Sequence, residues 1–169
     1  MRIEKLQDLF EIGLRYVYDC ENKLVKKGLP AMVDASSSPE LRQGFEQHLR
    51  ETQNHVTRLE QVFSIIGKKP DTESNDILDA MTKAAEKQIK NIEASPLRDA
   101  ALIESGNLVE HYEMAAYGTL VAWARQLGFS DAATLLQQTL EEEKAADAKL
   151  TQLGEKKINS TAAEHLRAA

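Results

Sequence analysis

The chain has 169 residues, 27 of them acidic and 21 basic, so its formal net charge at pH 7 is -6. This acidic balance argues against a general nucleic-acid binder or a protein of anionic membrane surfaces, because both need a basic face. The single cysteine, Cys20, excludes an internal disulfide. No signal-like N-terminus and no long apolar run is present. We therefore expect one cytoplasmic domain.

The composition is typical of an all-α protein, with few prolines and glycines and many strong helix formers. The first predicted helix covers residues 3–27 and buries a stripe that includes Phe10 and Leu14. Gly28 is expected to end this helix in the left-handed conformation. Glu21 falls inside the stripe, about 20° from Phe10 around the helix axis. A core-facing acid in this helix needs a partner for its charge.

The second long helix has a clear start and a clear end. Ser38 is expected to cap its N-terminus, with Pro39 at the first helical position and Gly67 after its last residue. Its buried side is apolar along most of its length. Glu51 and His55 lie on one flank of that side, where both side chains can reach the interior.

A long connection over residues 67–95 follows the second helix. It contains one short amphipathic helix, predicted over residues 75–92 with Ser74 as its cap. A helix of roughly 18 residues spans about 27 Å, which is enough to carry the chain back along a bundle. The second and third long helices should therefore run parallel.

Ser95 and Pro96 repeat the start signal and open the third long helix, which runs to residue 127 before Gly128. Its apolar line includes Leu102. Glu113 lies on that line, about 20° from Leu102. This helix therefore also brings one acid to its buried face.

The fourth long helix starts two residues after Gly128 and extends to residue 153, so it should pack antiparallel to the third. Two acids lie on its apolar stripe: Glu143 at about −20° and Asp147 at about +20° from Leu136. The neighbouring Glu141 and Glu142 are expected to point toward solvent.

Short, long and short connections are typical of a ferritin-like four-helix bundle, here with an extra short helix in the long crossover. The amphipathic pattern fades after residue 153. We expect the bundle to occupy residues 1–153 and a flexible or loosely docked tail to occupy residues 154–169.

Five acids and one histidine are predicted to meet inside the bundle. The first and third long helices each offer one glutamate, and the other two each offer a glutamate followed four residues later by a second ligand-type residue. Buried together, the carboxylates would repel one another, and two cations would balance their charge. Carboxylate-rich ligation with one imidazole suits iron or manganese better than zinc. The predicted ligands are Glu21, Glu51, His55, Glu113, Glu143 and Asp147, with Glu51 and Glu143 as bridges.

Some alternatives stay open. His48, three residues before Glu51, is a second candidate imidazole, although a lone histidine on a packed face is more often a core residue. Glu110 lies about 80° from the apolar line of its helix, which favours a surface group or one that contacts the ligands from outside. Tyr16, Tyr18, Tyr112, Tyr117 and Trp123 are candidates for oxidisable neighbours of a metal, with packing and a hydroxyl hydrogen bond as the simpler interpretation.

Three segments resemble the bacterial YciF family of ferritin-like proteins: residues 48–63, 95–120 and 140–153. The resemblance covers nearly the whole chain up to the tail. It implies the ferritin-like fold and an association with stress responses.

The broader di-iron carboxylate proteins use a Glu-x-x-His pattern on two helices, and this sequence departs from it. The second helix spaces Glu51 and His55 by four residues, and Ala146 occupies the usual histidine position of the fourth. Both spacings still keep each pair on one helical face. Without the second imidazole, the predicted site is more anionic.

The leading functional hypothesis is a stress-associated di-metal protein that reacts with O₂ or peroxide or holds iron. We expect a homodimer that binds neither nucleic acid nor membranes. The alternative is a structural or interaction protein that forms a helical dimer without catalytic turnover. In that case apolar residues off the main stripes would form the contact: Leu9, Val25, Ile65 and Leu108.

Overall fold

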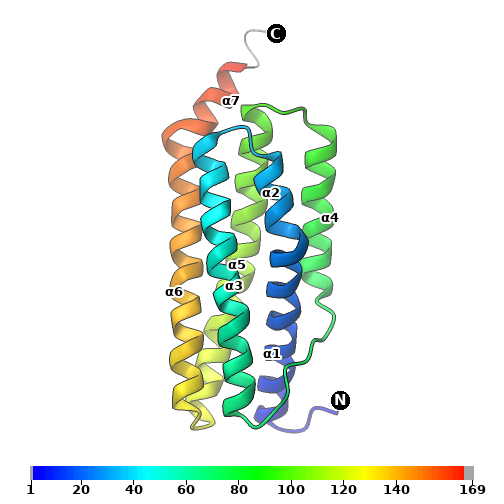
Figure 1. Ribbon diagram of the computed structural model, residues 1–169, viewed down its shortest axis with the longest axis vertical. Coiled ribbons are helices and arrows are strands. Elements are labelled where there is room, and N and C mark those ends of the chain that lie inside the picture. The colour runs from blue at the N-terminus through cyan, green and yellow to red at the C-terminus, as the bar shows by residue number, and fades with distance from the viewer. Residues whose placement is uncertain (1, 166–169) are drawn as a thin grey trace.

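The computed structural model describes residues 2–165, and all regular secondary structure in that range is helical. Four long helices form the predicted ferritin-like bundle (Figure 1): α1 (Leu6–Lys23), α3 (Pro39–Ile65), α5 (Pro96–Gln126) and α6 (Ser130–Leu153). The shorter α4 (Asp76–Asn91) lies outside these four and returns the chain to the end where α3 began. As predicted, α3 and α5 therefore run in the same direction.

The predicted boundaries of the long helices are largely confirmed. The hydroxyl of Ser38 accepts a hydrogen bond from Leu41 N, and that of Ser95 accepts one from Arg98 N, each at 3.3 Å. Gly67 and Gly128 adopt φ angles of 69° and 78°. This left-handed conformation is easy only for glycine, so it ends α3 and α5 at these residues.

The predicted end of the first helix at Gly28 is wrong. Gly28 has a φ angle of -60°, and the chain stays helical through a π-helical turn, η1 (Leu24–Gly28), into α2 (Leu29–Ala35). The apolar pattern explains the continuation, because Leu24, Leu29 and Met32 are all buried. A helix that ended at Gly28 would expose the last two of these side chains.

The predicted cap of the crossover helix is off by one residue. Asn75, not Ser74, caps α4, and its side-chain oxygen accepts from Leu78 N at 3.0 Å. The Asn75 amide nitrogen also donates to Tyr16 O at 3.1 Å and to Tyr112 Oη at 2.7 Å. These bonds tie the start of α4 to α1 and α5, and they are the reason why the buried Asn75 is chosen over the exposed Ser74.

The segment expected to be a flexible or loosely docked tail is helical as far as the structure describes it. A second π-helical turn, η2 (Gly154–Ile158), leads into α7 (Asn159–His165). Ile158 and Ala162 are buried against the bundle, and Lys157 Nζ pairs with Glu40 at 2.6 Å. Residues 166–169 lie outside the described range.

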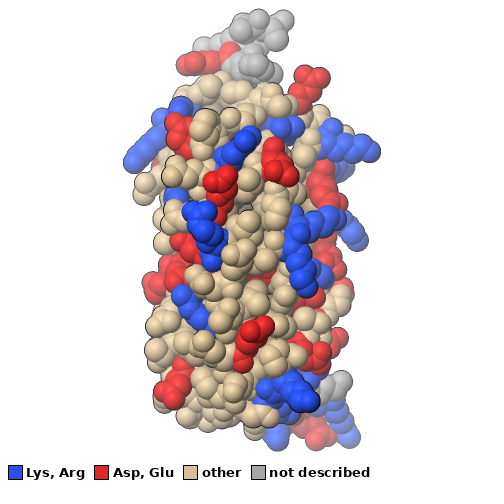
Figure 2. Space-filling model, in the orientation of Figure 1, with Lys and Arg blue, Asp and Glu red and all other residues tan. Residues whose placement is uncertain are grey.

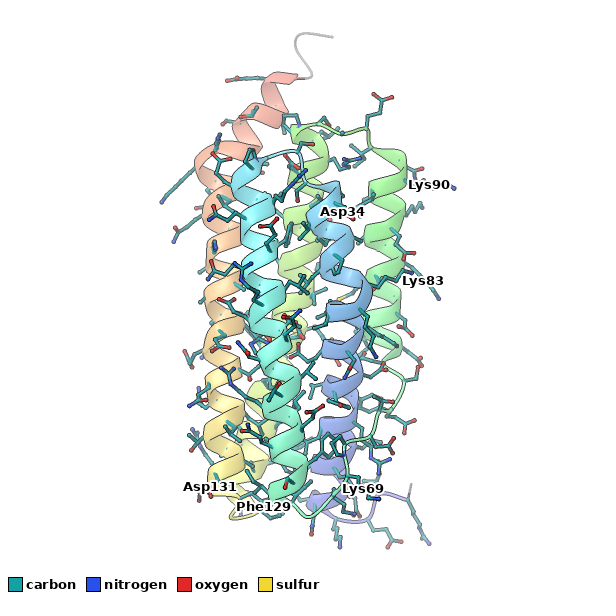
Figure 3. All side chains as sticks on the ribbon, viewed as in Figure 1. Asp34, Lys69, Lys83, Lys90, Phe129 and Asp131 are labelled. Carbon is teal, nitrogen blue, oxygen red and sulfur yellow. The ribbon has the colours of Figure 1, made fainter. Side chains whose placement is uncertain are left out.

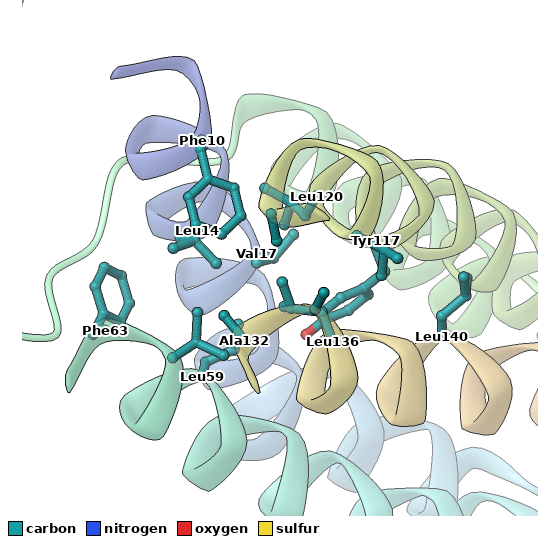
Figure 4. Packing of buried hydrophobic residues seen from close by; sticks show 14 residues of the cluster. Phe10, Leu14, Val17, Leu59, Phe63, Tyr117, Leu120, Ala132, Leu136 and Leu140 are labelled. Carbon is teal, nitrogen blue, oxygen red and sulfur yellow. The ribbon is translucent and has the colours of Figure 1, made fainter. Parts of the chain in front are cut away.

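The core is divided into two apolar clusters, one toward each end of the bundle. The first is built around residues such as Phe10, Leu59 and Leu136 (Figure 4), and the second around Leu41 and Leu102. Near the border of the two clusters, each long helix carries at least one buried acid or histidine: Glu21 on α1, His48 and His55 on α3, Glu110 and Glu113 on α5, and Glu143 on α6. The polar site therefore lies in the middle of the bundle, with an apolar seal on both sides.

The surface carries both signs of charge. On the face shown in Figure 2, Lys and Arg side chains are interspersed with Asp and Glu. Among the described residues, no helix is long and apolar enough to cross a membrane.

Candidate metal centre

Four long helices bring six buried polar side chains together in the middle of the bundle. Each is at most 6 % exposed. They come from α1, α3, α5 and α6, and they are Glu21, His48, His55, Glu110, Glu113 and Glu143. Buried residues of these types, with nitrogen and oxygen atoms converging, are the usual ligands of iron and manganese.

The six side chains form two overlapping groups in which one ligand atom of each residue lies within 4.8 Å of the others. The first contains Glu21, His55 and Glu143; the second contains Glu143 again with His48, Glu110 and Glu113.

Glu143 joins the two groups with a different oxygen toward each. Its Oε1 lies 3.1 Å from His55 Nδ1, and its Oε2 lies 3.6 Å from His48 Nε2. The remaining short contacts stay within one group: His55 Nδ1 lies 3.4 Å from Glu21 Oε1, and His48 Nε2 lies 3.2 Å from Glu110 Oε1. One carboxylate with an oxygen in each group has the arrangement of a bridge between two cations.

Many of the buried polar atoms have no hydrogen-bond partner within the protein. They include both oxygens of Glu143, one oxygen each of Glu21, Glu110 and Glu113, and Nδ1 of His55. Buried polar atoms are normally hydrogen-bonded, and a buried charge without a partner costs several kcal/mol. Each of these residues has a ligand atom within 4.8 Å of those of its group, so the donor set fits bound cations.

The pKa values show what this packing does in the absence of metal. Burial raises the pKa of Glu113 well above its usual range, and the charges of Glu143 and Glu21 raise it further. Burial likewise raises the pKa of Glu143 to about 8. For His55, burial favours the neutral ring, but the carboxylates of Glu21 and Glu143 outweigh it and raise the pKa to about 10. The metal-free cluster therefore keeps protons that metal ions would displace.

His55 is held in one orientation by a partner outside the cluster. Its Nε2 lies 2.8 Å from Glu142 Oε2, and Arg58 donates two hydrogen bonds to the same carboxylate at 2.6 and 2.7 Å. The bond from Arg58 keeps the pKa of Glu142 low, so this carboxylate is an acceptor and His55 Nε2 is the donor. Nδ1 then faces Glu21 and Glu143, so its lone pair would be directed at a cation once the proton of the metal-free ring is displaced.

This arrangement corrects the expectation that Glu142 points toward solvent. Its side chain is only 34 % exposed and crosses to α3. Glu142 does point away from the centre of the apolar stripe of α6. However, α3 packs along that flank of α6, and its residues Arg58 and His55 contact the Glu142 carboxylate. The exposed Glu141, by contrast, has the position expected from the sequence.

Two neutral donors complete the surroundings of the carboxylates. The hydroxyl of Tyr117 donates to Glu21 Oε1, and Cys20 Sγ lies 3.5 Å from Glu113 Oε1. Burial, with the nearby carboxylates, raises the pKa of Tyr117 and of Cys20 well above their ordinary values. Both groups therefore stay protonated. Tyr117 follows Glu113 by one helical turn, a spacing that the sequence contains but that does not single it out from the other tyrosines.

Two of the six predicted ligands, Glu51 and Asp147, belong to neither group. Glu51 is 31 % exposed; its Oε2 lies 3.5 Å from His48 Nδ1, and its Oε1 accepts from Gln47 at 2.8 Å. Asp147 is 21 % exposed and lies 3.2 Å from Nε2 of the exposed His111. Their places in the cluster are taken by His48 and Glu110, the two residues that the sequence left open.

An opening between α3 and α6 leads to the cluster. This cavity of about 100 Å³ is lined by Gln47, His48, Glu51, Glu110 and Ala146, among others. The small side chain of Ala146 leaves this space free. Glu51, which is partly exposed, also lines the opening, and an acid in such a position attracts cations.

The protein is thus a helical bundle with a buried cluster of carboxylates and imidazoles. Comparison with known sequences is specific: residues 5–163 match the family described as "Domain of unknown function (DUF892)", and the chain belongs to this family. Protein YciF of Escherichia coli K12 is 38 % identical over 170 residues, which cover 96 % of this chain and 98 % of YciF.

Solved structures agree with this assignment. The E. coli stress protein YciF superposes with a TM-score of 0.88 at 38 % identity, over 93 % of this chain and 99 % of YciF. YcfI of Rhodopseudomonas palustris gives a TM-score of 0.86 at 40 % identity, over 88 % and 94 % of the two chains. A Xanthomonas campestris protein, at 19 % identity and a TM-score of 0.76, shares the fold over 96 % and 99 %.

Proposed function

We propose that this protein binds two metal ions, iron or manganese, in the middle of its bundle and uses them to react with O₂ or peroxide. The observation that carries the proposal is the Glu143 carboxylate, which is fully buried, has no hydrogen-bond partner on either oxygen and directs one oxygen into each of two ligand groups. Buried polar atoms are normally paired, and a cation in each ligand group would give both oxygens of this carboxylate a partner.

The donor set supports the choice of metal. Four carboxylates and two imidazoles line the cluster, and the four negative charges would balance two divalent cations. Carboxylate and imidazole ligands without thiolate suit iron and manganese, whereas structural zinc sites are rich in cysteine. Cys20, the nearest thiol, stays protonated and hydrogen-bonded to Glu113, so it is not a ligand in this proposal.

Each part of the chain has a defined task in this proposal. Bound iron supplies the redox chemistry for O₂ or peroxide. The apolar clusters on both sides exclude water, Glu142 holds the His55 ring, and Tyr117 holds Glu21. The E. coli relative is named a stress protein, and a function against oxidants or free iron in the cytoplasm is consistent with that name.

The direct test is metal content. Protein purified from cells grown with iron and manganese should contain about two ions per chain by elemental analysis, since the proposal has one cation in each ligand group. Glu143→Ala should lose this metal, whereas Glu141→Ala, with its exposed carboxylate on the same helix, should keep it. A purified wild-type protein that contains no metal and takes up none on anaerobic Fe(II) addition would contradict the proposal.

A second candidate function has one observation in its favour: the R. palustris relative YcfI is provisionally described as a structural protein. In that case the acidic cluster would be a remnant, and the predicted homodimer would be the functional form. Added Fe(II) or Mn(II) would leave the melting temperature unchanged, whereas a bound metal raises it by mass action. Sedimentation of the purified protein tests the dimer independently.

A further inference from the structure

A second cavity, of about 60 Å³, also reaches the cluster. It is located between the π-turn η1 with α2 on one side and α4 on the other. Its walls are largely apolar and include Leu24, Leu29, Met32, Met81, Ala85 and Val109. Lys83 and Lys90 extend from α4 away from the bundle (Figure 3), so the other face of this helix is the one that covers the cavity.

The unexpected π-turn is part of the cavity wall. Leu24, Lys27 and Gly28 of η1 all line it. Single π-turns within α-helices are rare and occur often at functional sites. A Cβ on Gly28 would come within 3.0 Å of Leu24 Cδ2, so glycine permits the close packing of this turn.

The inner end of the cavity is formed by two members of the metal cluster. His48 and Glu110 line both this cavity and the opening between α3 and α6. They are only 6 % and 3 % exposed, and Glu110 Oε2 has no hydrogen-bond partner. The two cavities therefore share this pair of side chains, one of them between α3 and α6 and the other between α2 and α4.

We propose that the apolar cavity is a binding site for a small uncharged apolar molecule, such as a short alkyl chain or a single ring, whose inner end meets the metal centre at His48 and Glu110. The volume of about 60 Å³ is several times the 10–15 Å³ that a single water needs, so the cavity has room for a small molecule. Presentation of this molecule to a metal rests on the proposed function; its binding in the cavity does not.

The charges at the exposed side of the cavity argue against an anionic ligand. The ion pair between Lys27 and Glu86, at 2.7 Å, joins η1 to α4, and both side chains are exposed. The two partners already neutralise each other, and no other Lys or Arg lines the cavity. An anionic ligand would therefore lose hydration without gaining a free cation.

Methionine methyl groups provide a direct measurement. Met32 and Met81 line the cavity, whereas Met114 packs against the apolar cluster at the other end of the bundle. Benzene titrated into metal-free protein with ¹³C-labelled methionine methyls should shift the signals of Met32 and Met81 and leave that of Met114 in place. Pyridazine, with the same ring shape but a strong dipole, should bind at least about tenfold more weakly.

A matched pair of variants on α4 locates the binding. Ala85→Phe fills the cavity and should weaken benzene binding about tenfold or more, while Ala84→Phe adds the same ring on the exposed side and should leave it unchanged. Ala85→Leu is the milder variant if the phenylalanine disturbs folding. No shift of Met32 or Met81 with benzene near saturation, or equal binding to Ala84→Phe and Ala85→Phe, would overturn the proposed site.

A second measurement tests the connection with the metal centre. With Mn(II) bound, detected by its electron paramagnetic resonance signal, the benzene protons should relax much faster than in metal-free protein. Ala85→Phe should abolish this enhancement while Mn(II) stays bound. If benzene shifts the Met32 and Met81 signals as expected but the protein binds no Mn(II), the result would contradict the proposed function alone. Bound Mn(II) without enhanced relaxation would contradict only the approach of the ligand to the metal.

Discussion

Glu142 accepts a hydrogen bond from His55 Nε2 at 2.8 Å, and this contact turns the other ring nitrogen toward Glu21 and Glu143. Arg58 holds the Glu142 carboxylate in place from the far side. A residue that was expected in solvent thus sets the orientation of an inner ligand. This contact matters because hydrogen-bond partners behind the ligands orient those ligands and commonly have a large effect on metal affinity.

Removal of this partner should therefore weaken metal binding without removing a ligand. We expect Glu142→Ala to raise the metal dissociation constant about 10- to 100-fold, because the His55 ring loses its orientation. The measurement is competition with a chelator of known affinity. Glu142→Gln keeps an oxygen acceptor and should lose less, and Glu141→Ala should lose nothing. Equal affinities for Glu142→Ala and Glu141→Ala would show that the contact has no role.

The metal-free protein should become less stable as the pH rises. The pKa of Glu143 is raised from 4.5 to about 8, and that of His55 from 6.5 to about 10. A group whose pKa is raised by folding stabilises the native state fully below its unfolded pKa, and this contribution is lost as the pH passes through the folded pKa. Both groups therefore favour the folded state less and less between their two pKa values.

Thermal unfolding in EDTA checks this expectation. The melting temperature should be lower at about pH 8.5 than at about pH 6. Glu143→Gln carries no charge at either pH, so the difference should become smaller in that variant. Bound metal should also reduce it, since the metal replaces the protons. A metal-free wild type that is more stable at the higher pH would contradict the assignment of protons to this cluster.

Cys20 should be unreactive in the native protein. Its side chain is fully buried, and burial with the nearby Glu113 raises the pKa of the thiol well above its usual value. The thiolate is the reactive form, so modification by a disulfide reagent at about pH 8 should be slow until the protein is unfolded in denaturant. The release of the reagent's chromophore measures the rate. Fast native modification would show that the bundle opens readily at the metal centre.

The turn between α2 and α3 offers a test of stability away from the centre. Asp99 is buried on α5, and its two oxygens accept from the backbone nitrogens of Ser37 and Ser38 at 2.7 and 2.8 Å. Asp99→Ala leaves both donors without this charged partner and should cost about 2 kcal/mol of unfolding free energy. Urea denaturation measures the loss. Asp34→Ala, at an exposed position on α2, is the control and should change stability little.

Sequence alone was sufficient for most of the fold, because the signals are local. Ser38 with Pro39 and Ser95 with Pro96 start helices through contacts within one turn, and Gly128 ends one through its own φ angle. Apolar periodicity likewise placed Glu113 and Glu143 in the interior, as the structure has them. The general position of the cluster follows from these local rules.

The choice among neighbouring candidates depended on the tertiary structure. A helical angle gives the direction of a side chain but not its distance from the facing helix or the partner that it meets there. Glu51 meets Gln47 and Asp147 meets His111 outside the cluster, while His48 and Glu110 face each other inside it.

Packing between helices also explains the other differences between the predicted and the observed structure. The helix continues past Gly28 because Leu29 and Met32 are buried by packing against other parts of the chain, which no local signal reports. Glu142 is partly buried because its carboxylate pairs with Arg58 on the neighbouring helix α3. Periodicity in the sequence thus determined which helices carry buried acids, and packing between helices decided which of those side chains share one site.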